Sequence, residues 1–240
     1  MRMKGEIKTN AGKVQRRRKI IKYSKLALLI IFLLLLIAYV VVGVIYNNGN
    51  FSITLDKNLY YDKNLIVYDN NDYKVFRTEL YAQAVDYFDN ISYRWLPDNL
   101  DQVNSSHNGD NYVAYTFYIE NTGTDTSDYW SQVIIDDVIK NVDTAVRIRL
   151  YRNGEYVTYA KIGMNGEPER DTVPFHDDTL ITYDHREDFK PGDIDKYTVV
   201  MWIEGTDIDC TDNILGGEIK VHMEFNSEFK DVNNDKFNRE

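Results

Sequence analysis

The chain has 240 residues, with 28 Lys and Arg against 38 Asp and Glu, but the two signs are separated. Ten of the basic residues and only one acidic residue precede Leu26, so the first 25 residues carry a net charge of +9 and the remainder −19. An acidic domain of this kind repels nucleic acid. A single cysteine, Cys210, excludes an intramolecular disulfide framework and any multi-cysteine metal site.

The first expected element is a membrane helix. Leu26 to Ile45 are twenty residues without a charge, about the length that an α-helix needs to cross a bilayer core. The basic cluster before them favours the cytoplasmic side for the N-terminus. We therefore predict a basic cytoplasmic tail at residues 1–25, a transmembrane signal anchor at 26–46 and an extracytoplasmic β-sandwich domain at 47–240.

A cleaved signal peptide is the alternative interpretation of the same segment. Its apolar region is usually about 7 to 15 residues long and ends in a small-x-small cleavage site. Here the apolar run is longer, and Gly43 is the small residue near its exit. The sequence therefore favours an uncleaved anchor with its C-terminal domain outside the cell membrane.

Beyond the anchor, short runs rich in Val, Ile, Thr and Tyr predict strands. We expect strands, in chain order, at 51–55, 64–68, 112–120, 129–135, 146–151, 156–162, 180–183, 197–204 and 219–225. One helix is expected at Thr78 to Phe88, a short one at Asp137 to Val142, and a long polar loop at Leu96 to Asn111. This order predicts a mainly β chain, an antiparallel sandwich after one helix.

Two strands show which side chains should be buried. Ile219, Val221, Met223 and Phe225 alternate with polar residues, which predicts one buried and one wet face. Val146, Ile148 and Leu150 alternate in the same way with Arg147, Arg149 and Tyr151. The second strand ends in Asn153-Gly154, a pair that tolerates the positive φ angles of a type I′ turn, so residues 146–162 should form a β-hairpin.

A search for catalytic motifs yields none. His107, His176, His185 and His222 are not in a His-Glu-x-x-His helix, and no Gly-x-Ser-x-Gly is present. His222 and Glu224 share one face of a strand and offer two metal ligands, although a solvated strand face is the simpler interpretation. Cys210 lies among acidic residues that raise the pKa of its thiol, which disfavours a catalytic cysteine.

Calcium is the ion that the sequence suits best. Glu204, Asp207, Asp209 and Asp212 fall within nine residues of one expected loop, and carboxylate oxygens are the ligands that Ca²⁺ prefers. These four residues are the candidate calcium ligands, and an ordinary acidic loop is the simpler interpretation. No other cofactor is predicted.

Three segments resemble a known family. They are Tyr112 to Gly123, closing in Asn121-Thr122-Gly123; Phe189 to Gly205, with Pro191-Gly192-Asp193 and Trp202-Ile203-Glu204-Gly205; and Asp209-Cys210 followed by Leu215 to Ile219. Together they resemble the TasA and camelysin group of surface proteins of low-GC Gram-positive bacteria. The resemblance implies a jelly-roll-like β-sandwich at the cell surface, in some members assembled into biofilm matrix fibres.

The function expected from these observations is structural, in the matrix, or in adhesion and recognition, without catalysis. The expected partners are membrane lipid, through the N-terminal helix, and other surface or matrix proteins, including further copies of the chain, but not nucleic acid. Two alternatives stay open. One is a metal-dependent endopeptidase of the camelysin type, which zinc held by His222 and another histidine would favour. The other is an accessory subunit of a membrane complex.

Overall fold

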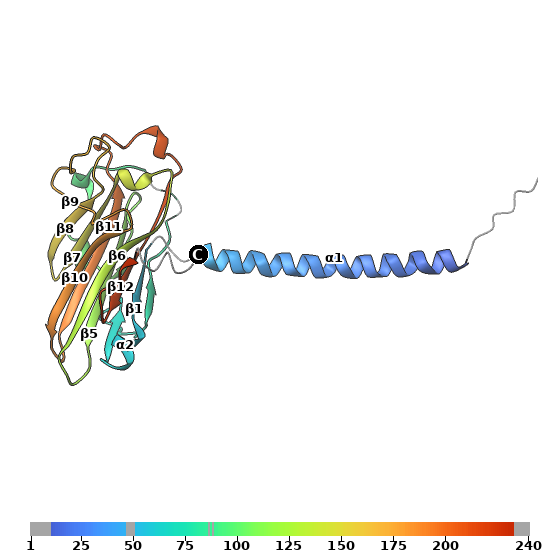
Figure 1. Ribbon diagram of the computed structural model, residues 1–240, viewed down its shortest axis with the longest axis horizontal. Coiled ribbons are helices and arrows are strands. Elements are labelled where there is room, and N and C mark those ends of the chain that lie inside the picture. Colours follow the sequence, from blue (N-terminus) through green and yellow to red (C-terminus); the bar gives the residue numbers. More distant parts are fainter. Residues whose placement is uncertain (1–10, 47–50, 86, 88, 233–240) are drawn as a thin grey trace, which may run out of the picture. The chain divides into compact units, whose positions relative to one another are not determined.

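The computed structural model describes residues 11–46, 51–85, 87 and 89–232. It divides the chain between Asn47 and Asn48 into two compact units, which we describe separately. The first contains one uninterrupted helix, α1, from Ala11 to Tyr46 (Figure 1). The segment from Arg16 to Val40 contains an 18-residue window with a mean hydropathy of 2.4 and is long and apolar enough to cross a membrane. A helix of this kind serves either as a membrane anchor or as a signal sequence, and the predicted tail lies partly outside the described residues.

The second unit is built from two β-sheets, which confirms the predicted mainly β class. The first sheet has the strand order β10-β6-β12-β1-β3. Its strands are β1 (Phe51–Leu55), β3 (Glu79–Tyr81), β6 (Ser127–Ile139), β10 (Leu180–Phe189) and β12 (Glu218–Asn226). Neighbouring strands are antiparallel except that β1, which follows the helical unit in the chain, runs parallel to β12.

The second sheet has the order β2-β5-β11-β7-β8-β9, with β4 also paired to β5. Its strands are β2 (Leu65–Tyr68), β4 (Ser105–Ser106), β5 (Val113–Asn121), β7 (Val146–Arg152), β8 (Glu155–Ala160), β9 (Val173–Pro174) and β11 (Ile194–Ile203). The pairs are antiparallel apart from β8 and β9. Short helices are α2 (Lys57–Tyr61), η1 (Tyr93–Trp95), η2 (Leu100–Gln102), η3 (Val142–Thr144) and η4 (Asp212–Ile214).

The main core contains side chains of both sheets. The alternation predicted for β12 is confirmed, because Ile219, Val221, Met223 and Phe225 are all buried in it. The rings of Phe117 on β5 and Phe225 on β12 meet edge to face with centroids 5.9 Å apart. Because apolar burial contributes about 25 cal/mol per Å², this core supplies the main driving force of folding.

The outer face of the second sheet is also covered, which the sequence did not predict. Ile91, Leu96 and Leu100 pack with Tyr151 and Trp202 in a separate apolar cluster. The expected wet face of β7 is therefore wrong for two of its residues, since Arg147 is 4 % and Tyr151 6 % exposed. We call residues 91–102, which include η1 and η2, the covering segment.

Both predicted helices of the outer domain are wrong. Thr78 to Phe88 contains strand β3 instead, and residues 82–85 are not helical; positions 86 and 88 lie outside the described residues. Leu80 and Ala82 are both buried, a period of two that pairing of β3 with β1 imposes over helical propensity. In place of the helix at 137–142, β6 continues to Ile139 and turns through Lys140 and Asn141, both at positive φ.

The predicted hairpin at Asn153-Gly154 is confirmed. Strands β7 and β8 pair from Arg147 and Ala160 to Arg152 and Glu155 around this two-residue turn. The φ angles of Asn153 and Gly154 are 52° and 95°, the left-handed conformation that a type I′ turn requires.

Candidate functional site

A groove of about 950 Å³ lies on the outer side of the second sheet. The residues that line it come from the covering segment, from β7 and β8, from the end of β11 and from a loop after β8; they lie within 92–101, 147–158, 169–172 and 202–207. Tyr93 and Tyr156, at its walls, are 45 % and 55 % exposed. The groove thus combines accessible aromatic rings with charged and hydroxyl side chains.

Glu204 holds the covering segment against the sheet. Its Oε2 accepts hydrogen bonds from the indole Nε1 of Trp202 at 3.0 Å and from the backbone N–H of Tyr93 at 2.9 Å. Its Oε1 accepts one from the hydroxyl of Thr206 at 2.6 Å. Burial alone would raise the pKa of this carboxyl, but these hydrogen bonds outweigh it and lower the pKa below its ordinary value.

The backbone on either side of Glu204 adds to this attachment. The N–H of Ile91 donates to the carbonyl of Ile203 at 2.9 Å, and the N–H of Gly205 donates to the carbonyl of Ile91 at 2.9 Å. The Trp202-Ile203-Glu204-Gly205 motif is therefore structural, because it ties the covering segment to the last residues of β11.

The predicted calcium ligands separate in the structure. Asp207 and Asp209 lie together at one end of the loop, with the backbone N–H of Asp209 donating to Asp207 at 2.8 Å. Glu204 is used by its own hydrogen bonds, and Asp212 is exposed in η4. Within the described residues, the group with suitable ligand spacing is Glu169, Asp207 and Asp209, whose oxygens lie within 4.8 Å of one another.

Arg147 bridges two of these three carboxylates, Glu169 and Asp207. Its Nη2 lies 3.0 Å from Glu169 Oε2 and also forms an ion pair with Asp207 Oδ2. Asp209 in turn accepts the backbone N–H of Met164 at 2.9 Å. As arranged, these residues suit a guanidinium better than Ca²⁺, and the calcium site stays a prediction.

Glu169 is the member of this group that sequence reasoning missed. It precedes Asp207 by 38 positions and belongs to the loop between β8 and β9, so no spacing within the 204–212 segment signals it. Burial, and then the charge of Asp207, raise the pKa of its carboxyl, and Arg147 partly offsets them. The cluster is therefore an ion-pair network made by folding.

The histidines of the described residues are engaged singly. His222 Nδ1 lies 2.8 Å from Asp136 Oδ1, and the ring of His185 stacks on Trp130 with centroids 4.3 Å apart. No histidine belongs to the group of metal-type ligands found in the described part of the chain. The arrangement offers no support for a zinc site on His222.

Cys210 is a free, partly buried cysteine. Burial raises the pKa of its thiol, and the nearby charges of Asp207, Asp89 and Glu204 raise it further. The prediction that acidic neighbours weaken its thiolate is confirmed.

A buried polar network lies near the other end of β11. Asp195 accepts a hydrogen bond from the hydroxyl of Tyr129 at 2.5 Å and one from Asn153 Nδ2 at 2.8 Å, with Arg186 Nε at 3.2 Å. Burial would raise the pKa of this carboxyl, but the two hydrogen bonds and the charges of Arg152 and Arg186 hold it below its ordinary value. The network fixes the turns at the ends of β7 and β10.

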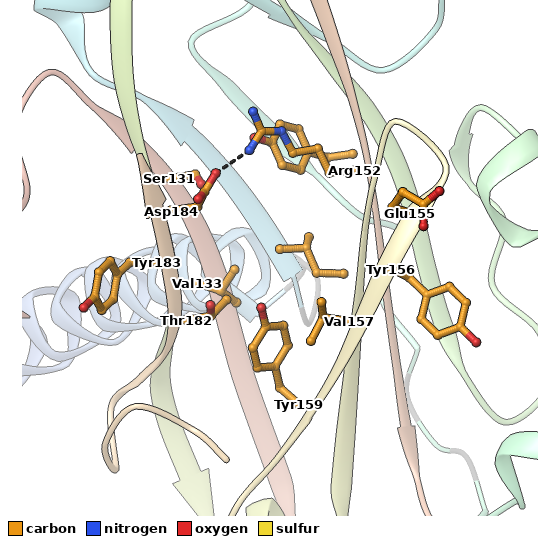
Figure 2. A pocket seen from close by; sticks show the side chains of 12 residues that line it. Ser131, Val133, Arg152, Glu155, Tyr156, Val157, Tyr159, Thr182, Tyr183 and Asp184 are labelled. Carbon is orange, nitrogen blue, oxygen red and sulfur yellow. Dashed lines mark hydrogen bonds and ion pairs between the residues drawn. The ribbon is translucent and has the colours of Figure 1, made fainter. Parts of the chain in front are cut away.

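A smaller cleft, about 330 Å³, lies between the two sheets at one side of the sandwich. Figure 2 shows Val133 and Thr182 of the first sheet facing Val157 and Tyr159 of the second. An ion pair between Arg152 and Asp184 joins the sheets beside it (Figure 2). Aliphatic side chains, tyrosine rings and polar groups all line this cleft, so it is more mixed in chemistry than the core beneath it.

Comparisons with known proteins add no functional information. No protein-family model matches the chain, and no curated protein matches it. Among solved structures, it is similar to a chain of β-glucosidase from Kluyveromyces marxianus in complex with glucose, at 11 % identity and a TM-score of 0.24. The match covers 73 % of this chain and 16 % of the glucosidase chain. A match at this TM-score carries no argument about fold or function, so a function has to be argued from the groove.

Proposed function

We propose that this chain is a membrane-anchored surface protein whose β-sandwich recognises a ligand or partner through the groove, without catalysis. The observation that carries the proposal is the combination of a large groove with a covering segment fixed by Glu204, Trp202 and the backbone of β11. Binding sites are typically concave, largely preformed and placed on a rigid scaffold.

The state of the charged groups supports recognition over hydrolysis. Three of the acids that line the groove are already engaged: Glu204 by hydrogen bonds, and Glu169 and Asp207 by Arg147. A metal site needs several ligand atoms close together, and within the described residues the group that offers them, Glu169, Asp207 and Asp209, already forms ion pairs with Arg147 through two of its members. This argues against the metal-dependent endopeptidase, whereas the accessory-subunit alternative remains a form of recognition.

The anchoring half of the proposal depends on α1. The helix ends at Tyr46 and β1 begins at Phe51, so an uncleaved helix would tether the sandwich through β1, an inner strand of the first sheet. The test uses the full chain in bacterial protoplasts. External protease should digest the acidic domain and spare the basic tail, and the protein should stay with the membranes after a carbonate wash. Protection of the domain would contradict the orientation, and a mature N-terminus near residue 46 would show that the helix is a signal peptide.

The recognition half is tested on the full chain in lipid nanodiscs. A panel of soluble surface-type polymers, namely neutral glycans, acidic glycans and acidic peptides, is titrated against wild type and Asp98→Trp. Asp98 lines the groove and is exposed, so the new indole should obstruct ligands without disturbing the core. Glu187→Trp, on the exposed edge strand β10, is the matched control. Saturable binding lost only in Asp98→Trp is expected, and binding equally strong in both variants would refute the groove as the site.

A further inference from the structure

Arg149 is a groove residue whose charge is not balanced by an acid. It lies between Arg147 and Tyr151 on β7, and its Nε donates to the hydroxyl oxygen of Thr158 at 3.0 Å. Its Nη1 makes one long contact of 3.5 Å with the Tyr151 hydroxyl. Within the described residues no Asp or Glu forms an ion pair with it, in contrast to the neighbouring Arg147.

Two aromatic rings hold this guanidinium in place. Its central carbon lies 4.5 Å from the ring centroid of Tyr156 and 5.3 Å from that of Trp202. Cation–π contacts and the bond to Thr158 fix the plane of the group while leaving most of its N–H donors uncommitted. A preorganised guanidinium of this kind binds a carboxylate with two parallel hydrogen bonds.

The surroundings favour a ligand with sugar rings over a peptide. The ring of Tyr156 is 55 % exposed beside the guanidinium and offers an apolar face for stacking. The hydroxyl of Thr172 donates to the carbonyl of Glu169 at 2.8 Å, and its oxygen can still accept a hydrogen bond from a ligand hydroxyl. A peptide would seek backbone partners, yet β7 lies between β8 and β11 in the sheet, so its backbone is already paired on both sides.

The charge of the domain sets a further condition. At −19 beyond residue 25, the protein repels polyanions at long range, so an acidic ligand must be held by direct contacts and not by a general positive field. The repulsion therefore excludes polyanions in general. Only a ligand whose carboxylate fits the guanidinium of Arg149 and whose ring fits against Tyr156 overcomes it.

We propose that the groove binds an acidic saccharide, with a uronate carboxylate on the guanidinium of Arg149 and the sugar ring against Tyr156. This inference rests on the proposed recognition function. The chemical class is a glycan of uronic acid residues. Arg147, which forms ion pairs with Glu169 and Asp207, holds the loop in place and is not part of this carboxylate site.

The test measures binding of a short oligogalacturonate to the full chain in nanodiscs, by calorimetry in the presence of a chelator. Its methyl ester keeps the rings and removes the charge, and a glutamate oligopeptide keeps the charge without rings. Arg149→Gln should weaken binding by about tenfold or more, as expected when one partner of a charge-assisted fork is lost. Arg77→Gln, which removes the same charge from an exposed position that does not line the groove, should change binding less than about twofold.

The other outcomes are decisive. Equal binding of the acid and its methyl ester, or unchanged binding in Arg149→Gln, would overturn this inference. Preference for the glutamate peptide would also overturn it in favour of a protein ligand. If no oligogalacturonate binds while another polymer of the panel binds in a manner sensitive to Asp98→Trp, the saccharide class is wrong and the proposed recognition function stands. If nothing binds the groove, both are wrong. Melting curves of each variant confirm that it is folded.

Discussion

Replacement of Glu204 by alanine should detach the covering segment and lower the stability of the whole domain. The side chain accepts hydrogen bonds from Trp202, Tyr93 and Thr206, and it is 5 % exposed. Without it, the buried indole N–H of Trp202 and the partly buried backbone N–H of Tyr93 lose their acceptor. A buried donor left unpaired costs about 1 to 3 kcal/mol.

The structure sets the size of the effect. Two donors at that cost each, with some relief from entering water, give a loss of about 3 to 5 kcal/mol. For a domain of this size, 1 kcal/mol lowers Tm by about 2 to 4 °C, so Glu204→Ala should lower Tm by roughly 6 to 20 °C. Glu204→Gln keeps one acceptor oxygen and should lose less.

Two measurements check this reasoning on the fragment 48–240, which contains both apolar clusters. Calorimetry gives Tm, and native-state hydrogen exchange reports on residues 91–102 separately from the sheets. Glu187→Ala, at an exposed position of β10, is the control and should leave both unchanged. A variant Glu204→Ala that melts within about 1 °C of wild type, or exchanges no faster in the covering segment, would show that the carboxylate does not hold it.

Three further predictions follow from the core, the buried acids and the ion-pair cluster. Met223→Ala should lower the free energy of unfolding by about 2 to 4 kcal/mol because it leaves a cavity, whereas His222→Ala on the other face of the strand should lower it by under about 0.5 kcal/mol. Urea unfolding of the two variants measures both losses, and the reverse order would contradict the assigned faces. Because the pKa of Asp195 is lower in the folded than in the unfolded state, its carboxylate stabilises the fold above the unfolded pKa of about 3.9, and this stability is lost as pH falls from there through the folded pKa. Asp195→Asn should therefore flatten the decline of Tm in acid, and an equally steep decline in this variant would refute the role of Asp195. Because Arg147 sits between Glu169 and Asp207, a chelator should leave Tm unchanged and Arg147→Met should cost about 3 to 5 kcal/mol, whereas a clear rise of Tm with calcium would restore the predicted metal site.

The sequence predicted the fold where one physical signal dominated. Apolar residues at every second position of β12, and Asn153-Gly154 between β7 and β8, reflect local chemistry, and both were confirmed. Leu80 and Ala84 share a helical face in the sequence, yet Leu80 is in a strand because β1 offers it a partner. Such pairing depends on a residue that is distant in sequence, so no local pattern reveals it.

The site was harder to predict than the fold because its residues act across long sequence separations. The alternation at Val146 to Tyr151 predicted a wet face, since nothing in residues 91–102 signals that they would cover it. The acidic run at 204–212 suggested calcium because the sequence shows like charges together and does not show Arg147, which folding places between them.

The motifs that carry the family resemblance have structural roles in this chain. Asn121 donates through Nδ2 to the carbonyl of Phe189 at 2.8 Å, and its carbonyl accepts the N–H of Gly192 at 2.8 Å, so Asn-x-Gly and Pro-Gly-Asp together join the end of β5 to the turn between β10 and β11. Glu204, in the Trp202-Ile203-Glu204-Gly205 motif, fastens the covering segment. Residues that build turns and attachments report on a fold, and proteins with different ligands can share them. What distinguishes this chain is the surface that those attachments support, above all Arg149 and Tyr156, and its function should therefore be sought through them.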